Sequence, residues 1–296
     1  MTDQTAPYRQ QNTASGVLMM LGAFVMYTGI DTFSKALGEM GYHPVMITWG
    51  RTAIQILMIT PFLLHAGGMG AFATAHPKMQ LLRGVVMTFA GIFFVSGLAY
   101  LPLATMTAIN FINPFLITIL SIFVLGEQVG RHRWVAIALG FFGALVIIRP
   151  GLEGFHPAGL FSVAAAFCWA ISVIATRLVQ DRDSGMVTMF WSALIGVGLT
   201  SAIVPFIWQP FGTDAIPHLI GMGVCSLAGQ GFMIAALRHA SPSLLAPLGY
   251  SQLIWATIVG YFLFGNLPDG WTWVGAGIIV LSGLYMWWRE QKAADS

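Results

Sequence analysis

The chain has 296 residues, of which 57% are hydrophobic and only 8% are charged, with a mean hydropathy of +0.77. A soluble domain carries about 25% charged residues, so this composition excludes an ordinary water-facing surface. The formal net charge of +2 is too small and too scattered for a nucleic-acid-binding protein.

Ten apolar stretches are each long enough to cross a bilayer, which takes about 20 helical residues. In chain order they cover residues 16–37, 44–65, 80–100, 102–124, 132–149, 157–179, 185–208, 214–237, 241–263 and 270–288. The expected fold class is therefore an all-α membrane protein with ten transmembrane helices and no separate soluble domain. Outside the spans lie the connecting loops and two tails, at 1–15 and 289–296, and the polar first tail is not typical of a cleaved signal peptide.

The basic residues predict the orientation of these spans. With the N-terminus in the cytoplasm, ten of the 13 Lys and Arg residues lie on the cytoplasmic side. Only Lys35, Arg51 and Arg149 lie on the other side. We therefore expect both tails to be cytoplasmic.

The two groups of five spans, 16–149 and 157–288, share local sequence features. Gly126-Glu127 corresponds to Gly265-Asn266, and Trp134 follows the first pair at the same distance as Trp273 follows the second. Because five is odd, the second group must enter the membrane from the opposite side to the first. The pattern predicts an inverted repeat, which can expose one central site alternately to each face.

These features resemble the ten-helix EamA-type members of the drug/metabolite transporter superfamily. The resemblance covers the whole chain, including Arg51 in the second span and the fourth span from Pro102 to Glu127. Within the superfamily the chain is most similar to YddG-type exporters of aromatic amino acids, although Asn266 stands where the pattern has an acid. The resemblance implies a central cavity bounded by spans 1, 3, 4, 6, 8 and 9, and amino-acid export across the bacterial inner membrane.

Charged side chains inside a bilayer are costly and need a partner or a function. In the first span, Tyr27 and Asp31 share one helical face, and Asp31 and Lys35 are spaced to form an ion pair near the outer rim. The alternative is that Asp31 contacts a substrate ammonium or a coupling proton. Arg51 is the other deep charge, and we expect it to join Asp31 in a structural or gating cluster.

Two prolines are expected to interrupt spans that line the cavity. Pro114 follows Asn113 and leaves the carbonyl of Asn110 without its helical donor. Pro247 does the same in the ninth span. A freed carbonyl can accept a hydrogen bond from a substrate, and interrupted helices are typical of transporter sites. The alternative is that helix packing tolerates both prolines.

Aromatic and amide side chains occur in the same spans. Candidate substrate-binding residues are Tyr27, Tyr100, Trp169, Gln230, Tyr250, Gln252 and Trp255, together with Asp31, Asn110 and Asn113. Such a lining suits bulky, mostly apolar solutes. The alternative is helix–helix packing, with the amides forming hydrogen bonds between helices.

Several sequence patterns exclude other functions. There is no Walker motif and no convergent catalytic set, so we expect neither ATP-driven transport nor an enzyme. The sequence suggests no cofactor and no metal site. We predict an exporter of aromatic and other neutral amino acids that works by alternating access, with a proton-coupled multidrug exporter of the same fold as the alternative. Glycines in the fifth and tenth spans (Gly140, Gly143, Gly275, Gly277) permit a homodimer, but contacts within the chain explain them equally well.

Overall fold

The computed structural model describes residues 13–126, 130–152, 155–179, 183–240 and 242–294. Helices are the only regular secondary structure in these ranges. The first half contains α1 (Thr13–Glu39), α2 (Pro44–Gly67), the 3₁₀ turn η1 (Gly68–Phe72), α3 (Pro77–Leu98), α4 (Leu103–Asn110), α5 (Asn113–Leu125) and α6 (Arg131–Ile148). The second half contains α7 (Gly159–Val179), α8 (Gly185–Ser201), η2 (Val204–Phe206), α9 (Ala215–His239), α10 (Pro242–Leu245), η3 (Ala246–Tyr250), α11 (Ser251–Phe264) and α12 (Gly270–Ala294).

Within the described ranges, nine segments are long and apolar enough to cross a membrane. They correspond to nine of the ten predicted spans. The remaining span, 241–263, is divided among α10, η3 and α11, and α11 alone has 14 residues. The all-helical membrane fold expected from the sequence is confirmed, and the ninth span is the one that departs most from a continuous helix.

Local sequence explains how the helices begin and end. Proline occupies the first position of α2 and of α3, where its missing N–H costs no helical hydrogen bond. α5 and α11 both end at a left-handed glycine, Gly126 with φ 69° and Gly265 with φ 66°. A residue with a side chain would be strained in that conformation.

The fourth and ninth spans are interrupted at equivalent places. The first interruption lies at Phe111, fifteen residues before Gly126, and the second ends at Tyr250, fifteen residues before Gly265. The rings of Phe111 and Tyr250 meet edge to face, with their centroids 5.3 Å apart. Although Pro114 and Pro247 are not equivalent in position, the two interruptions are equivalent and touch each other.

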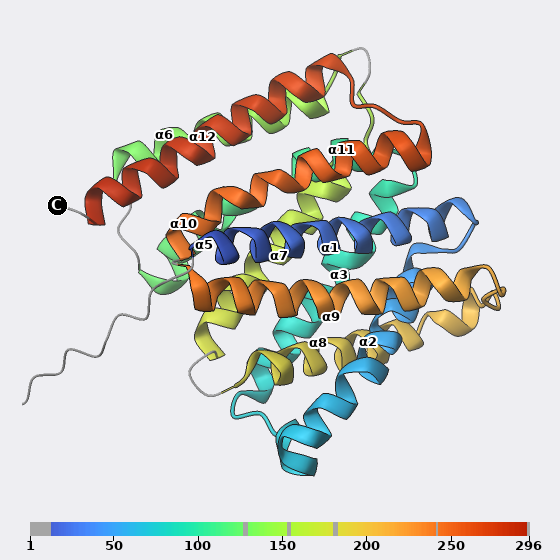
Figure 1. Ribbon diagram of the computed structural model, residues 1–296. Helices are drawn as coiled ribbons and strands as arrows, with labels where there is room; N and C mark the ends of the chain where they lie inside the picture. Colours follow the sequence, from blue (N-terminus) through green and yellow to red (C-terminus); the bar gives the residue numbers. More distant parts are fainter. Residues whose placement is uncertain (1–12, 127–129, 153–154, 180–182, 241, 295–296) are drawn as a thin grey trace, which may run out of the picture.

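Helix pairing follows an approximate twofold axis. α1 packs along α9 and α3 packs along α7, and these are the two most extensive contacts in the bundle. Each joins the first helix of one half to the third helix of the other. Figure 1 shows α1 beside α9 in the middle of the bundle and α6 beside α12 at one edge. Each of these two helix pairs therefore contains one helix from each half.

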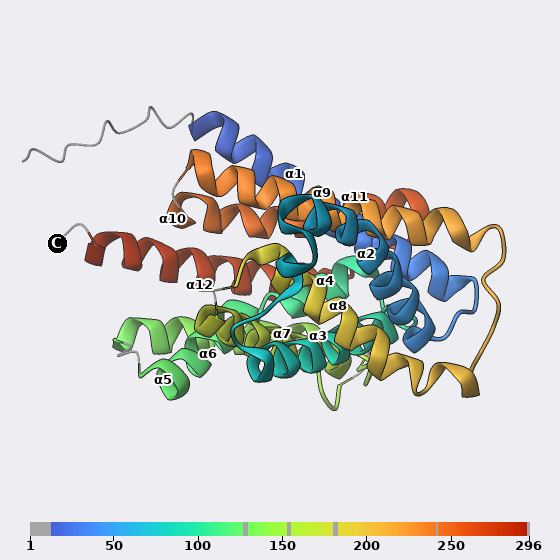
Figure 2. The same ribbon diagram turned by 90° about the horizontal axis from the view of Figure 1, so that it is seen from below.

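The two ends of the chain lie at one end of the bundle. The first residues of α1 and the last residues of α12 are on the same side in both views (Figures 1 and 2). We call this the terminal end and the other the distal end. An even number of membrane crossings requires this arrangement. That the terminal end faces the cytoplasm remains a prediction from the basic residues.

At the edge formed by α6 and α12, two glycines allow close packing within the chain. A Cβ on Gly143 would lie 2.8 Å from the carbonyl oxygen of Gly275, and one on Gly275 would lie 2.5 Å from that of Gly143. Gly140 accommodates the ring of Phe115, whereas nothing lies within 4 Å of a Cβ on Gly277. Contacts within one chain therefore account for three of these four glycines.

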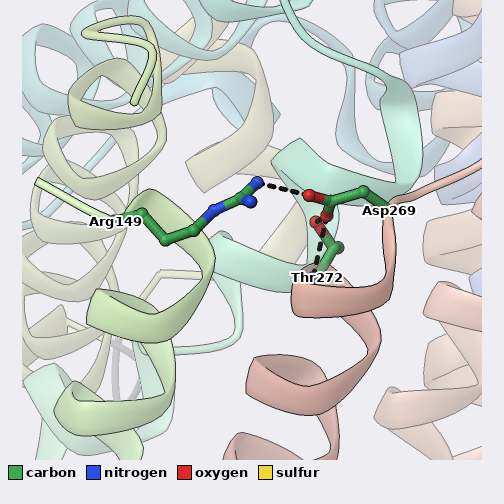
Figure 3. Close-up of polar contacts among 3 residues, drawn as sticks. All are labelled: Arg149, Asp269 and Thr272. Carbon is green, nitrogen blue, oxygen red and sulfur yellow. Dashed lines mark hydrogen bonds and ion pairs between the residues drawn. The ribbon is translucent and has the colours of Figure 1, made fainter. Parts of the chain in front are cut away.

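A polar contact joins α6 and α12 at the distal end. Asp269 caps α12, because its Oδ1 accepts hydrogen bonds from the N–H of Thr272 (2.9 Å) and from the Thr272 hydroxyl (2.5 Å). Its Oδ2 pairs with the guanidinium of Arg149, which follows α6 (Figure 3). One carboxylate thus satisfies the start of one helix and holds the end of its neighbour.

Candidate functional site

The candidate site is built around the polar face of α1. The Oδ2 of Asp31 accepts a hydrogen bond from Nε2 of Gln252 on α11, at 3.3 Å. One turn earlier, the hydroxyl of Tyr27 donates to Oε1 of Gln230 on α9, at 3.4 Å. Four predicted site residues from three spans therefore form two contacts on one helical face. Both contacts join the first half of the chain to the second.

Arg51 brings an opposite charge to this site from α2. Its guanidinium interacts electrostatically with the carboxylate of Asp31, but the two groups make no hydrogen bond to each other. Instead, Nη2 of Arg51 packs against Gly91 of α3, where a Cβ would lie 2.5 Å away. The predicted association of Arg51 with Asp31 is thus electrostatic, without a direct ion pair among the described contacts.

Lys35 does not pair with Asp31, which corrects the expected ion pair. Its amine donates to the carbonyls of Leu98 (3.0 Å) and Leu101 (3.4 Å), just before α4, and lies 3.7 Å from the carboxylate of Glu39. The physical reason is that these carbonyls lie at the end of α3 and in the turn after it, where carbonyls lack helical donors. Lys35 therefore ties α1 to the α3–α4 turn, and Asp31 is left facing Gln252.

The interruption in the fourth span has an asparagine on each side. α4 ends at Asn110 and α5 begins at Asn113, directly before Pro114. Nδ2 of Asn113 donates to Oδ1 of Asn110 at 3.2 Å, so the two predicted asparagines contact each other across the break. Because Phe111 touches Tyr250, this pair lies beside the start of α11.

Four buried polar atoms in these elements have no hydrogen-bond partner. They are Nε of Arg51, Oδ1 of Asn113, Oγ of Ser251 and Nε1 of Trp255. Ser251 and Trp255 are one turn apart on α11 and flank Gln252, the partner of Asp31. A buried polar group without a partner costs about 1–3 kcal/mol, so such a group calls for a ligand or water. These four atoms mark the candidate binding site.

Three other predicted site residues make none of the contacts described so far, and their role in binding remains a prediction. The Tyr100 side chain is 63% exposed and its ring contacts His156 at the distal end. The Trp169 side chain is 45% exposed on α7. The hydroxyl of Tyr250 packs against Gly283 of α12, in space that a side chain there would fill. Tyr250 is therefore turned toward the peripheral helix and not toward Asp31.

Sequence reasoning missed Ser251 and Gly91 as parts of this site. Serine is common in membrane helices and forms hydrogen bonds to its own backbone in many of them, so an unpartnered serine has no signature in sequence. Gly91 matters only because Arg51 reaches it from another helix. A glycine opposite a buried arginine cannot be recognised without the packing.

The repetition of this architecture agrees with comparisons to known proteins. The sequence profile of the EamA-like transporter family matches residues 14–149 and again residues 156–288. The chain belongs to the EamA-like transporter family. The superfamily assigned from the sequence is thereby confirmed.

EamA-like relatives with assigned solutes align along nearly the whole chain. An S-adenosylmethionine uptake transporter of Rickettsia prowazekii is 27% identical over 282 residues, which is 95% of each chain. A riboflavin transporter of Vibrio cholerae is 30% identical over 283 residues, 94% of this chain and 95% of the relative. A pseudopaline exporter of Pseudomonas aeruginosa is 25% identical over 273 residues, 90% of this chain and 94% of the exporter.

A solved structure shares the EamA-like fold described above. This crystal structure superposes with a TM-score of 0.61 at 19% identity, covering 92% of this chain and 96% of the other. The family match and the relatives, and not this structure, show that the chain is a multi-pass membrane transporter of small metabolites. The relatives do not agree on solute or direction, so neither follows from family membership.

Proposed function

We propose that this EamA-like transporter exports amino acids, or solutes with an amino-acid group, that also carry an aromatic ring. The observation that carries the proposal is the separation of Asp31 from Arg51. Asp31 and Arg51 carry opposite charges and have other neighbours, Gln252 and Gly91, without a direct ion pair between them, so each charge is available to one end of a zwitterion. An ammonium would bind Asp31, and a carboxylate would bind the guanidinium of Arg51.

The unpartnered atoms support the same solute class. Oδ1 of Asn113 accepts hydrogen bonds, Nε1 of Trp255 donates them and the Ser251 hydroxyl does both. They can satisfy polar atoms of a ring or of a head group. The aromatic surfaces of Tyr27 and Trp255 offer stacking partners for a ring. S-adenosylmethionine, named for one set of relatives, combines an amino-acid group with a ring system, and we place this chain's solute in that chemical class.

Alternating access would follow from the shared centre. The hydrogen bonds of Asp31 and Tyr27 described above both cross between the halves. Rocking of one half against the other would therefore change the site as it changes the exposed face. Export, in place of uptake, rests on the resemblance to amino-acid exporters.

Counterflow in proteoliposomes tests the proposal. Vesicles are loaded with unlabelled solute, and uptake of labelled phenylalanine, tryptophan, alanine, S-adenosylmethionine and riboflavin is compared. We expect protein-dependent, saturable counterflow of amino-acid solutes with rings, weaker counterflow of alanine, and none of riboflavin, which has no amino-acid group. Counterflow of riboflavin alone would contradict the zwitterion site. Flux that neither saturates nor shows counterflow would indicate a passive channel.

A variant separates binding from packing. Trp255→Phe removes Nε1, which has no hydrogen-bond partner. The substitution keeps a six-membered aromatic ring at this position. We expect unchanged thermal stability in detergent and a higher half-saturation concentration for solutes with polar rings. A drop in melting temperature with unchanged half-saturation would instead assign Trp255 to packing.

A flux that depends on a proton gradient and persists for cationic drugs without amino-acid groups would favour the multidrug alternative.

A further inference from the structure

Tyr42 and Asp183 occupy equivalent positions in the two halves. Tyr42 directly precedes His43, the N-cap of α2, and Asp183 directly precedes Ser184, the N-cap of α8. Each cap accepts a hydrogen bond from its own helix, His43 from Val45 and Ser184 from Val187. The second helix of each half therefore starts in the same way. In each, the residue before the N-cap is more than nine-tenths buried.

Both side chains bind the same part of the opposite half. The Tyr42 hydroxyl accepts a hydrogen bond from the N–H of Gly212 (2.8 Å) and donates to the carbonyl of Pro210 (3.4 Å). The Oδ1 of Asp183 accepts from the N–H of Ala75, at 2.9 Å. Gly212 and Ala75 lie in the loops that connect the second and third helices of their halves. Each side chain thus forms hydrogen bonds to the opposite half, Tyr42 at the distal end and Asp183 at the terminal end. We call these two sets of hydrogen bonds the distal clasp and the terminal clasp.

The two clasps differ in chemistry. Oδ2 of Asp183 accepts from the Thr74 hydroxyl (2.5 Å) and from Nε2 of Gln80 (2.8 Å), and Nε2 of Gln80 also reaches Thr188 (3.3 Å). Oε1 of Gln80 is buried without a partner. A flipped amide would place that oxygen against the carboxylate, so the charge on Asp183 fixes the orientation of Gln80.

Three residues after Gln80, Arg83 extends the polar contacts. Its guanidinium donates to the Thr176 hydroxyl (2.7 Å), the carbonyl of Thr188 (2.9 Å) and the Ser192 hydroxyl. It therefore joins α3 to α7 and α8. The terminal end is closed by a carboxylate, an amide and a guanidinium that link the two halves.

At the distal end the side chains packed around Tyr42 are apolar. Leu219 and Met222 of α9 pack in the hydrophobic cluster that contains Tyr42. The Phe211 ring lies 4.9 Å from the Tyr42 ring. Opening this end would expose aromatic and aliphatic surface, whereas opening the terminal end would expose groups that water solvates well.

We propose that Asp183 is a latch, a side chain whose hydrogen bonds keep the terminal face of this transporter closed. Tyr42 is its counterpart at the distal face. The charge on Asp183 sets the equilibrium between the state open at the terminal face and the state open at the distal face. The proposal rests on the alternating access proposed above. Both sets of hydrogen bonds are formed in the structure. In this proposal, opening of each face breaks the set on that side. Burial raises the pKa of Asp183, but hydrogen bonds from Thr74, Ala75 and Gln80 and the nearby His76 outweigh burial and hold the pKa below its ordinary value. The carboxylate is therefore charged at neutral pH.

Spin-label distances test the latch without any solute, so a wrong solute assignment cannot affect the result. Cys168 and Cys225 are first replaced by alanine. One label pair, at Ala71 and Met186, spans the terminal clasp, where both residues line a cavity of about 420 Å³ beside Asp183. A second pair, at Met40 and Thr213, spans the distal clasp. Distances are measured by double electron–electron resonance in nanodiscs.

We expect Asp183→Asn and Asp183→Ala to add a longer Ala71–Met186 distance and to leave the Met40–Thr213 distance unchanged. The ratio of open to closed molecules should rise by about tenfold, which corresponds to about 1.4 kcal/mol. Tyr42→Phe should lengthen only the distal pair. Asp214→Asn is the matched control, because Asp214 lies in the loop before α9 and its side chain does not cap that helix; it should change neither distance.

Two results would overturn the proposal. One is an unchanged Ala71–Met186 distance in Asp183→Ala protein whose helical content and melting temperature show that it is folded. The other is equal lengthening of both pairs, which would show general loosening and not a latch. Asp183→Asn guards against misfolding, because the asparagine can still accept from the N–H of Ala75 while it lacks the charge.

Discussion

Asp31 and Gln252 form a hydrogen bond of 3.3 Å between the first helix of one half and the interrupted ninth span of the other. The same carboxylate interacts electrostatically with Arg51 on α2. Asp31 of α1 therefore interacts both with a helix of its own half and with a helix of the other half. If the proposed zwitterion site is right, solute binding and the contact between the halves both involve this one acid.

Replacement of Asp31 by asparagine should remove solute binding without unfolding the protein. Asparagine keeps an oxygen that can accept the Gln252 hydrogen bond but provides no charge for an ammonium. We expect counterflow of amino-acid solutes to fall by at least about tenfold, the effect of losing about 1.4 kcal/mol, with little change in melting temperature. Glu39→Gln, on the same helix and about half exposed, should transport normally. Full activity of the Asp31→Asn protein would contradict an ammonium site.

Gly91→Ala should displace the Arg51 guanidinium. The new Cβ would stand 2.5 Å from Nη2, which is the mobile end of a long side chain. The fold should therefore tolerate the substitution while the position of the charge changes. We expect impaired counterflow at nearly wild-type melting temperature. Gly38→Ala is the matched control, since nothing lies within 4 Å of its Cβ. Equal transport by both variants would show that the location of Arg51 does not matter.

Alanine at Gly143 or Gly275 should separate α6 from α12. In each case the new Cβ would contact a backbone carbonyl oxygen at less than 3 Å, and a backbone cannot move aside as a side chain can. We expect each substitution to destabilise the protein by about 1–3 kcal/mol, seen as a lower melting temperature in detergent. The double variant should lose less than the sum, because one separation relieves both clashes. Gly277→Ala should be neutral.

The Asp269 cap should give a pH-dependent contribution to stability. Burial raises the pKa of Asp269, but the hydrogen bonds from Thr272 and the charge of Arg149 outweigh it, so the pKa lies below its ordinary value. The contribution is therefore fully present above about pH 4, the ordinary value for aspartate, and is lost as the pH falls through the lowered pKa. Asp269→Asn should lower the melting temperature at about pH 7 and lose this effect in acid. An equal effect of the substitution at both pH values would contradict the role of the charge.

Much of the architecture follows from the sequence because a bilayer imposes simple constraints. Every backbone polar group in lipid needs an internal partner, so long apolar stretches must be helices, and the distribution of Lys and Arg predicts their direction. The five-plus-five pattern and the turns at Gly126 and Gly265 indicate two related halves. Polar residues such as Asp31, Arg51 and Gln252 stand out because they are costly in lipid.

Only the tertiary structure decided which of these residues meet. Spacing alone favoured Asp31 with Lys35, but Lys35 reaches the unpaired carbonyls after α3, and Asp31 faces Gln252, more than two hundred residues away. Tyr250 is indistinguishable in sequence from a cavity residue, yet its hydroxyl lies against Gly283 of α12. The sequence determines which side chains are costly to bury, because that cost depends on the residue and on the lipid around it. Which side chains meet depends on how the helices of the two halves pack together. Contacts between residues so far apart in the sequence leave no periodic pattern along the chain, so the sequence does not reveal them.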